Sequence, residues 1–132
     1  MVVKRFAQIL GVVLILVGIV GLVLGDRVWL GILNVDIFED IVHLITGGIL
    51  AYVGFGQTDL STARSVVLAL GIIYLVVGIL GFVVPMMFGL IPHGYTLFDD
   101  LLHLALGVLG IAVALSAPRE SRQSGRRSAR VR

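Results

Sequence analysis

The stretch FEDIVHLITG, residues 38–47, decides the fold, because it recurs as FDDLLHLALG at residues 98–107, 60 positions further on. Each copy contains two adjacent carboxylic acids, then a histidine three residues after the second acid, and then a predominantly apolar run. Ionisable side chains are unusual at the start of so hydrophobic a segment. The two copies therefore form either a chemical site or a pair of helix starts.

The repeat extends upstream of this motif. The same displacement aligns GVVLILVGIVGLV, residues 11–23, with GIIYLVVGILGFV, residues 71–83, without a gap. Apolar sequence produces chance matches of Val and Leu, but hardly the shared pattern F-x-D-x-x-H-L-x-x-G. We therefore predict two tandem helical hairpins in parallel orientation, repeat one over about 6–56 and repeat two over about 66–117.

The composition indicates a membrane protein. Of the 132 residues, 58% are hydrophobic and 14% charged, and the mean hydropathy is +1.10. A soluble domain averages about 45–50% apolar and about 25% charged residues. The absence of cysteine excludes disulfides and thiolate metal sites.

Four apolar segments are predicted to span the bilayer, which makes an all-α fold in a single transmembrane domain, residues 1–117. They cover about Phe6–Gly25, Ile41–Gly56, Val66–Val84 and Leu101–Ala117. The first and third are uncharged and long enough for a hydrocarbon core of about 30 Å, and they lack the polar face of a soluble bundle helix. The second and fourth reach that length only if their helices begin near Ile37 and Leu97. The first lacks a signal-peptide cleavage site, so we expect a retained anchor.

The basic residues predict the orientation. We expect Lys4 and Arg5 to precede the first helix and Arg64 to lie in the loop between the second and third. Six arginines lie in residues 118–132, and only Arg27 falls on the opposite side. The positive-inside rule then places both termini in the cytoplasm. We expect the tail to be disordered and to attract anionic lipids. Nucleic-acid binding is not expected, because no folded basic domain accompanies the tail.

Glycines are expected to bring the helices together, because helices in lipid associate by close approach along small residues. Several recur at seven-residue spacing, which suits a left-handed crossing. The predicted helix-packing residues are Gly11, Gly18, Gly21 and Gly47 in the first repeat, and Gly71, Gly78, Gly81 and Gly107 in the second.

Three acids are interpreted as helix-capping residues. Asp36 and Glu39 have the spacing of a capping box with an acidic cap, and Thr96 and Asp99 have it as well. A carboxylate in a first turn also interacts favourably with the helix dipole, by about 0.3–1 kcal/mol. We therefore predict that Asp36, Glu39 and Asp99 start helices.

The second acid of each motif is grouped with the histidine instead. Asp40 and His43, and likewise Asp100 and His103, lie one helical turn apart on one face. One interpretation is structural: each histidine bonds its own carboxylate or a carbonyl and fixes the helix orientation. Another is a mononuclear site for zinc, iron or manganese made of these four residues. A di-iron carboxylate centre would need further acids that the first and third segments lack.

Haem binding and ion or proton transfer are two further interpretations of the motif. A haem between His43 and His103 needs a facing pair at equal depth, which the repeat provides, but glycine-packed helices leave little room for a porphyrin. A proton or cation pathway, or an outward-facing pH sensor, also uses ionisable groups in a membrane. Polar residues deeper in the spans are limited to Thr46 and Tyr74. The sequence contains no nucleophile–base pair or nucleotide motif, so we expect no enzyme.

The first helix, with its pattern GxxLxxxGIxG from Gly11, and the last, LFDDLLHLALGVLGIA, resemble a known group. They are similar to small bacterial and archaeal membrane proteins of the domain of unknown function 4383 family. In that family a histidine followed by a glycine opens the later helices, like His43 with Gly47 and His103 with Gly107. The resemblance covers about residues 6–117. It implies a four-helix membrane fold and indicates no activity.

Together these features predict a multi-pass protein of a prokaryotic plasma membrane. The leading hypothesis is a non-enzymatic scaffold or accessory subunit that needs no cofactor and contacts a protein partner or a second copy. The competing hypothesis is a metal- or cation-binding membrane protein whose ligands are Asp40, His43, Asp100 and His103.

Overall fold

The computed structural model describes residues 2–56 and 58–117, so the predicted disordered tail lies outside the described residues. The described chain contains four long helices: α1 (Val2–Leu24), α2 (Ile37–Phe55), α3 (Leu60–Val83) and α4 (Leu97–Ser116). Each is long and apolar enough to cross a membrane. The prediction of four spanning-length helices is therefore confirmed.

Two of the four helices begin at the residue that the sequence predicted. α2 and α4 begin at Ile37 and Leu97, as their lengths required. α1 and α3 begin at least one turn before their predicted starts. For α3 the reason is an N-cap: the Asp59 carboxylate accepts the Thr62 backbone N–H at 2.6 Å, which starts the helix ahead of the uncharged run. That backbone hydrogen bond lowers the pKa of the Asp59 carboxyl.

The basic residues near these starts belong to helices, so the prediction that they lie outside them was wrong. Lys4 is in the first turn of α1, and its Nζ donates to the carbonyl of Gly56, the C-cap of α2, at 3.3 Å. Arg64, at the equivalent place in α3, donates from Nε to the Ala114 carbonyl of α4 at 2.7 Å. A long cationic side chain can bury its stem and bring its charge to the negative end of a neighbouring helix.

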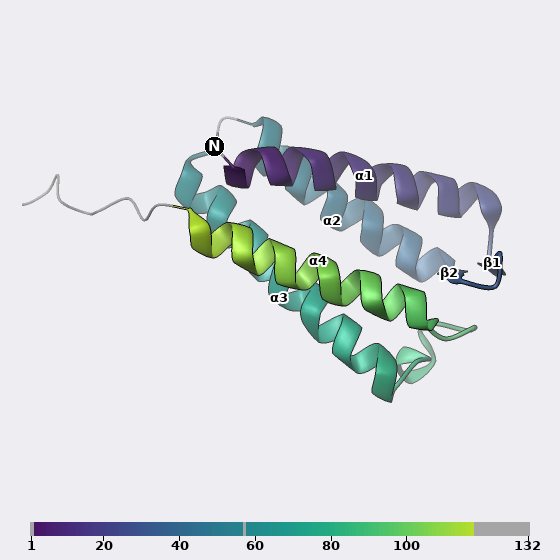
Figure 1. Cartoon of the computed structure of the whole chain (residues 1–132). Helices are drawn as coiled ribbons and strands as arrows, with labels where there is room; N and C mark the ends of the chain where they lie inside the picture. The colour runs from purple at the N-terminus through teal and green to yellow at the C-terminus, as the bar shows by residue number, and fades with distance from the viewer. Residues whose placement is uncertain (1, 57, 118–132) are drawn as a thin grey trace, which may run out of the picture.

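The helices form two close pairs. α1 packs along α2 and α3 along α4, whereas the two pairs contact each other much less. Figure 1 shows the pairs close together at the end that holds the chain's N-terminus and diverging toward the other end. That other end, where α1 and α3 finish, also holds a short 3₁₀ helix, η1 (Met87–Gly89). We call it the hairpin end, after the β-hairpin that lies there.

The β-hairpin was not predicted from the sequence, which indicated an all-helical fold. β1 (Arg27–Trp29) and β2 (Leu33–Val35) pair antiparallel, with Val28 opposite Asn34. The turn between them places Leu30 and Gly31 at φ of 52° and 73°. Because such conformations are rare for leucine, the sequence gives no clear signal of this turn.

Close contact within each pair depends on glycine. A Cβ at Gly11 would lie 2.6 Å from the backbone nitrogen of Ala51, and one at Gly78 would lie 2.7 Å from that of Leu104. All eight predicted packing glycines meet their partner helix closely: six approach its backbone, and Gly21 and Gly81 meet the carboxylates of Asp40 and Asp100. The glycine contacts are therefore made within the pairs and are not left open on the surface.

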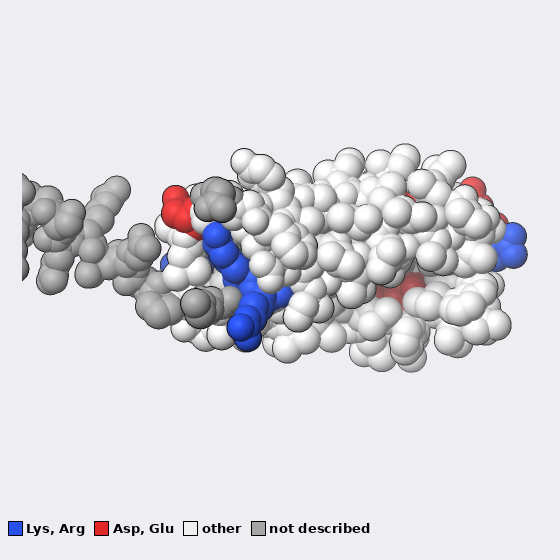
Figure 2. Space-filling view, turned by 90° about the horizontal axis from the view of Figure 1, so that it is seen from above, with Lys and Arg blue, Asp and Glu red and all other residues white. Residues whose placement is uncertain are grey.

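The surface is apolar along its length and charged mainly at its ends. In Figure 2 most of the visible surface is uncharged, and Lys and Arg side chains gather near the end that carries the N-terminus. Acidic atoms are visible inside a hollow toward the opposite end. An apolar belt between polar ends is the distribution that a bilayer requires.

Adjacent glycines of α2 provide a matched test of this packing. We expect Gly47→Ala to lower the free energy of unfolding by about 1–3 kcal/mol, the usual effect of overpacking. Its Cβ would meet the Gly11 carbonyl oxygen and the Ile15 nitrogen at 2.9 Å. Gly48→Ala adds the same methyl group where nothing lies within 4 Å, so stability should be unchanged or slightly higher. Unfolding in mixed micelles with increasing SDS measures both, and equal effects would contradict the packing scheme.

Candidate functional site

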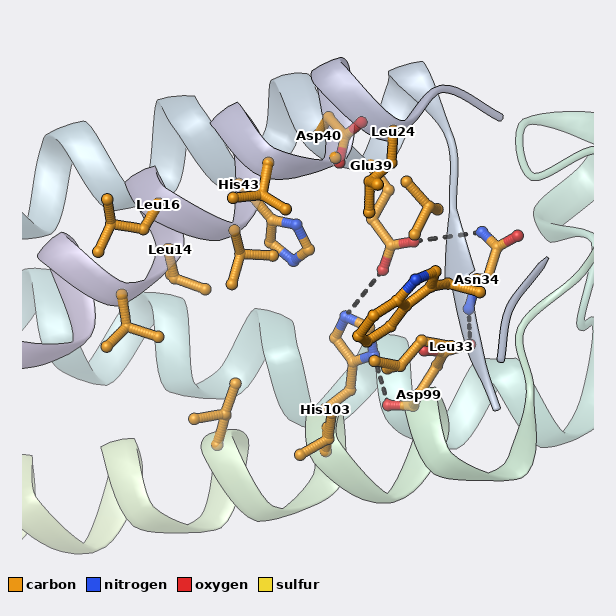
Figure 3. Close-up of a pocket in the computed structure, with 18 of the residues that line it drawn as sticks. Leu14, Leu16, Leu24, Leu33, Asn34, Glu39, Asp40, His43, Asp99 and His103 are labelled. Carbon is orange, nitrogen blue, oxygen red and sulfur yellow. Dashed lines mark hydrogen bonds and ion pairs between the residues drawn. The ribbon is translucent and has the colours of Figure 1, made fainter. Parts of the chain in front are cut away.

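A buried group of polar side chains occupies the hairpin end, where α2 and α4 begin. We call it the polar cluster, and it comprises Asn34, Asp36, Glu39, His43, Asp99 and His103. All are buried except His43, which is half-buried. It lies between the two helix pairs, and Figure 3 shows all of its members except Asp36.

Helix capping accounts for two of its acids. Asp36 is the N-cap of α2, and its Oδ1 accepts the Glu39 backbone N–H at 2.9 Å. At the start of α4, Thr96 and Asp99 form a reciprocal capping box. At the start of α2 only half of the capping box forms. Asp36 accepts the Glu39 N–H, but the Glu39 carboxylate faces the neighbouring pair instead of the backbone of its own N-cap. Glu39, predicted as a capping acid, is therefore available for another interaction.

Asn34 of β2 connects the starts of α2 and α4. Its backbone N–H donates to Asp99 Oδ2 at 2.9 Å. Its side-chain amide donates to Asp36 Oδ2 at 2.5 Å and to Glu39 Oε2 at 3.3 Å. A second hydrogen bond joins the β-hairpin to the start of α4: the Thr96 hydroxyl donates to the Ile32 carbonyl at 2.5 Å.

The sequence analysis did not identify Asn34. One signal was present: glycine, at position 94, stands in the equivalent position of the second repeat, so an amide breaks the repeat just before a capping acid. Its partners depend on the β-hairpin, which the sequence did not reveal.

The two histidines meet one acid from α2. His103 Nε2 lies 3.8 Å from Glu39 Oε1, and His103 Nδ1 donates to the Asp99 carbonyl at 2.8 Å. One ligand atom each from Glu39, His43 and His103 can be chosen so that all three lie within 4.8 Å of one another. Figure 3 shows both imidazole rings directed into the same pocket as the Glu39 carboxylate.

This trio differs from the four residues that the sequence predicted as metal ligands. Asp40 lies against Gly21 of α1, and Asp100 lies against Gly81 of α3, so both acids face the partner within their own pair. Adjacent helical residues point about 100° apart, whereas residues i and i+4 share a face. The acid that accompanies His43 is therefore Glu39, four residues before it.

Aromatic rings enclose His103. Tyr74 of α3 stacks on it with ring centroids 5.6 Å apart, and Tyr95 lies at 5.1 Å in a tilted arrangement. The Tyr74 hydroxyl also hydrogen-bonds the Thr46 hydroxyl of α2 at 3.1 Å. Burial, reinforced by the nearby Glu39 carboxylate, raises the pKa of the Tyr95 phenol, which therefore stays neutral.

Two cavities reach the trio from opposite sides. One, of about 510 Å³, lies between α1, α2, α4 and β2, and the other, of about 300 Å³, lies between α2 and α3. Both are lined mainly by apolar side chains, and both include Glu39, His43 and His103. The trio is thus the polar group that two largely apolar cavities between the helix pairs share.

The polar cluster is rich in acids and poor in bases. Within residues 2–56 and 58–117, the only ion pair is the contact between His103 and Glu39, and no Lys or Arg pairs with the buried acids. Such an arrangement favours a cation or a proton, because a buried carboxylate needs a positive partner or hydrogen bonds.

Comparison with known proteins identifies one family. A model of the family described as Domain of unknown function (DUF4383) matches residues 4–116. The resemblance inferred from the glycine and histidine motifs is therefore confirmed. No curated protein and no solved structure matches the chain.

Proposed function

We propose that this chain, which belongs to the DUF4383 family, is a non-enzymatic scaffold or accessory subunit of a membrane. The observation that carries the proposal is the use of its polar side chains. Asn34 and Thr96 join the β-hairpin to α4, and Glu39 of α2 pairs with His103 of α4. These groups hold structural elements together, as expected where the function of a protein is to present a fixed surface.

We further propose that the helix pairs are two tandem units of parallel orientation. Equivalent residues make equivalent contacts, which supports this arrangement. Gly21 lies against Asp40 in one pair and Gly81 against Asp100 in the other. Lys4 and Arg64, 60 positions apart near the starts of α1 and α3, likewise hydrogen-bond carbonyls near the ends of the partner helices.

In the proposed topology both termini lie in the cytoplasm and the hairpin end faces outward, in the plasma membrane of a prokaryote. The positions of Lys4, Arg5 and Arg64 at the end opposite the β-hairpin support it. On the same side the arginines of residues 118–132 would be attracted to anionic lipids.

A partner, whether a second copy or another protein, would have to use the lipid-facing sides of the helices. The eight packing glycines are already covered within the pairs. Large apolar side chains, in contrast, project outward from every helix. Van der Waals packing of such faces is a usual source of association in lipid.

The topology can be tested with single cysteines, since the chain has none of its own. Ser61 and His93 are exposed at opposite ends of the molecule. In intact cells a membrane-impermeant maleimide should label His93→Cys and leave Ser61→Cys unlabelled. After permeabilisation both should react. Labelling of Ser61→Cys in intact cells would contradict the proposed topology.

The scaffold proposal predicts a stoichiometric assembly. We expect the tagged chain, expressed at its native level and extracted in polymer-bounded lipid discs, to contain a second copy or another membrane protein in fixed ratio. Native mass spectrometry measures that ratio. Untagged chain added after extraction controls for association during preparation. Discs that hold one copy of this chain and no stoichiometric protein would contradict the proposal.

A further inference from the structure

We propose that Glu39, His43 and His103 form a mononuclear site for a divalent transition-metal ion between the two helix pairs. The site goes beyond the scaffold proposal and does not depend on it. It also differs from the ligand set predicted from the sequence, because Asp40 and Asp100 face glycines of their own pairs.

The donor set suits such an ion. Two imidazole nitrogens and one carboxylate oxygen are ligands used by zinc and by non-haem iron, with further positions left for water. Bonds of about 2.0–2.2 Å at tetrahedral angles place two ligands of one ion about 3.4 Å apart. The three ligand atoms lie within 4.8 Å of one another, so side-chain rotations that shorten these separations by up to about 1.4 Å close the set.

The hydrogen bond of His103 prepares its other nitrogen for a metal. The Asp99 carbonyl can only accept, so the proton of this 2.8 Å bond is on Nδ1. In the neutral ring, Nε2 then directs a lone pair toward Glu39 Oε1, 3.8 Å away. Two acceptors that face each other need a proton or a cation between them. Metal-binding histidines commonly donate their other N–H to a carbonyl in this way.

His43 supplies an independent observation. Its Nδ1 is buried and has no hydrogen-bond partner among the described residues. A buried polar atom without a partner is destabilising, because it loses its hydrogen bonds to water. Coordination of this ring by an ion shared with Glu39, four residues earlier on the same face of α2, would provide a function for the imidazole.

The charge around the site also favours a dication. The first turns of α2 and α4 bury Glu39 and Asp40, and Asp99 and Asp100. In the described parts of the chain no Lys or Arg forms an ion pair with any of them. A divalent ion would supply positive charge where burial makes unpaired carboxylates costly. The two cavities provide access to it.

The test is metal binding by the full-length chain, purified in detergent and stripped with a chelator. Co²⁺ is the optical probe, because its visible absorption reports the ligand geometry, and Zn²⁺ is the competitor. We expect one Co²⁺ per chain, displaced by Zn²⁺. His43→Ala, His103→Ala and Glu39→Gln should each weaken binding at least about 10-fold.

Two variants serve as controls. His93→Ala removes an exposed histidine outside the trio. Asp100→Asn neutralises an acid in the first turn of α4 whose side chain faces Gly81. Both should still bind one Co²⁺ per chain, with a much smaller change in affinity than the three ligand variants. Circular dichroism identifies any variant that fails to fold. Glu39→Gln keeps the size of the side chain and tests the site even if a histidine variant does not fold.

Each result decides the proposal. Folded wild-type protein that binds no stoichiometric Co²⁺ or Zn²⁺ would reduce the trio to a histidine–carboxylate ion pair and overturn the metal site. Binding that survives all three ligand variants, or that is lost equally in His93→Ala, would overturn it as well. The scaffold proposal is judged separately, by the protein stoichiometry of the lipid discs.

Discussion

A polar group that enters the hydrocarbon must find its partner within the protein, because no water is available there. Most groups of the polar cluster meet this constraint by joining elements that are far apart in the sequence, whereas His43 Nδ1 and Asn34 Oδ1 have no partner among the described residues. Asn34 binds acids at the starts of both α2 and α4, and Glu39 reaches His103 across the gap between the pairs. The position of the β-hairpin and the meeting of the two histidines both follow from these contacts.

The contacts within each helix pair and the contacts between the two pairs stabilise the structure in different ways. Glycines determine the structure within each pair, where backbones touch and no side chain fits. Between the pairs the contacts are few and two cavities remain, so the hairpin end is held largely by hydrogen bonds and the contact between Glu39 and His103. A metal ion bound by the trio would strengthen the weaker of the two junctions.

The sequence predicted most of the fold, because span length and glycine spacing are local properties. It also identified Asp36 and Asp99 as caps, His43 and His103 as neighbours, and the family. It grouped Glu39 with the capping acids, whereas the Glu39 carboxylate contacts Asn34 and His103, because the side chain that an acid faces depends on the neighbouring helix. Asn34 was missed because its partners depend on a turn that places Leu30 at positive φ.

The most direct test of the central claim is the distance between the helix pairs at each end, measured by electron paramagnetic resonance with spin-labelled cysteines. Labels at Arg27 and His93 report the hairpin end, and labels at Val2 and Ser61 report the other. We predict that Asp99→Ala, which removes the acceptor of the Asn34 backbone N–H, broadens and lengthens the first distance distribution and leaves the second unchanged. A hairpin-end distribution that stays narrow in Asp99→Ala would show that the polar cluster does not hold the pairs together.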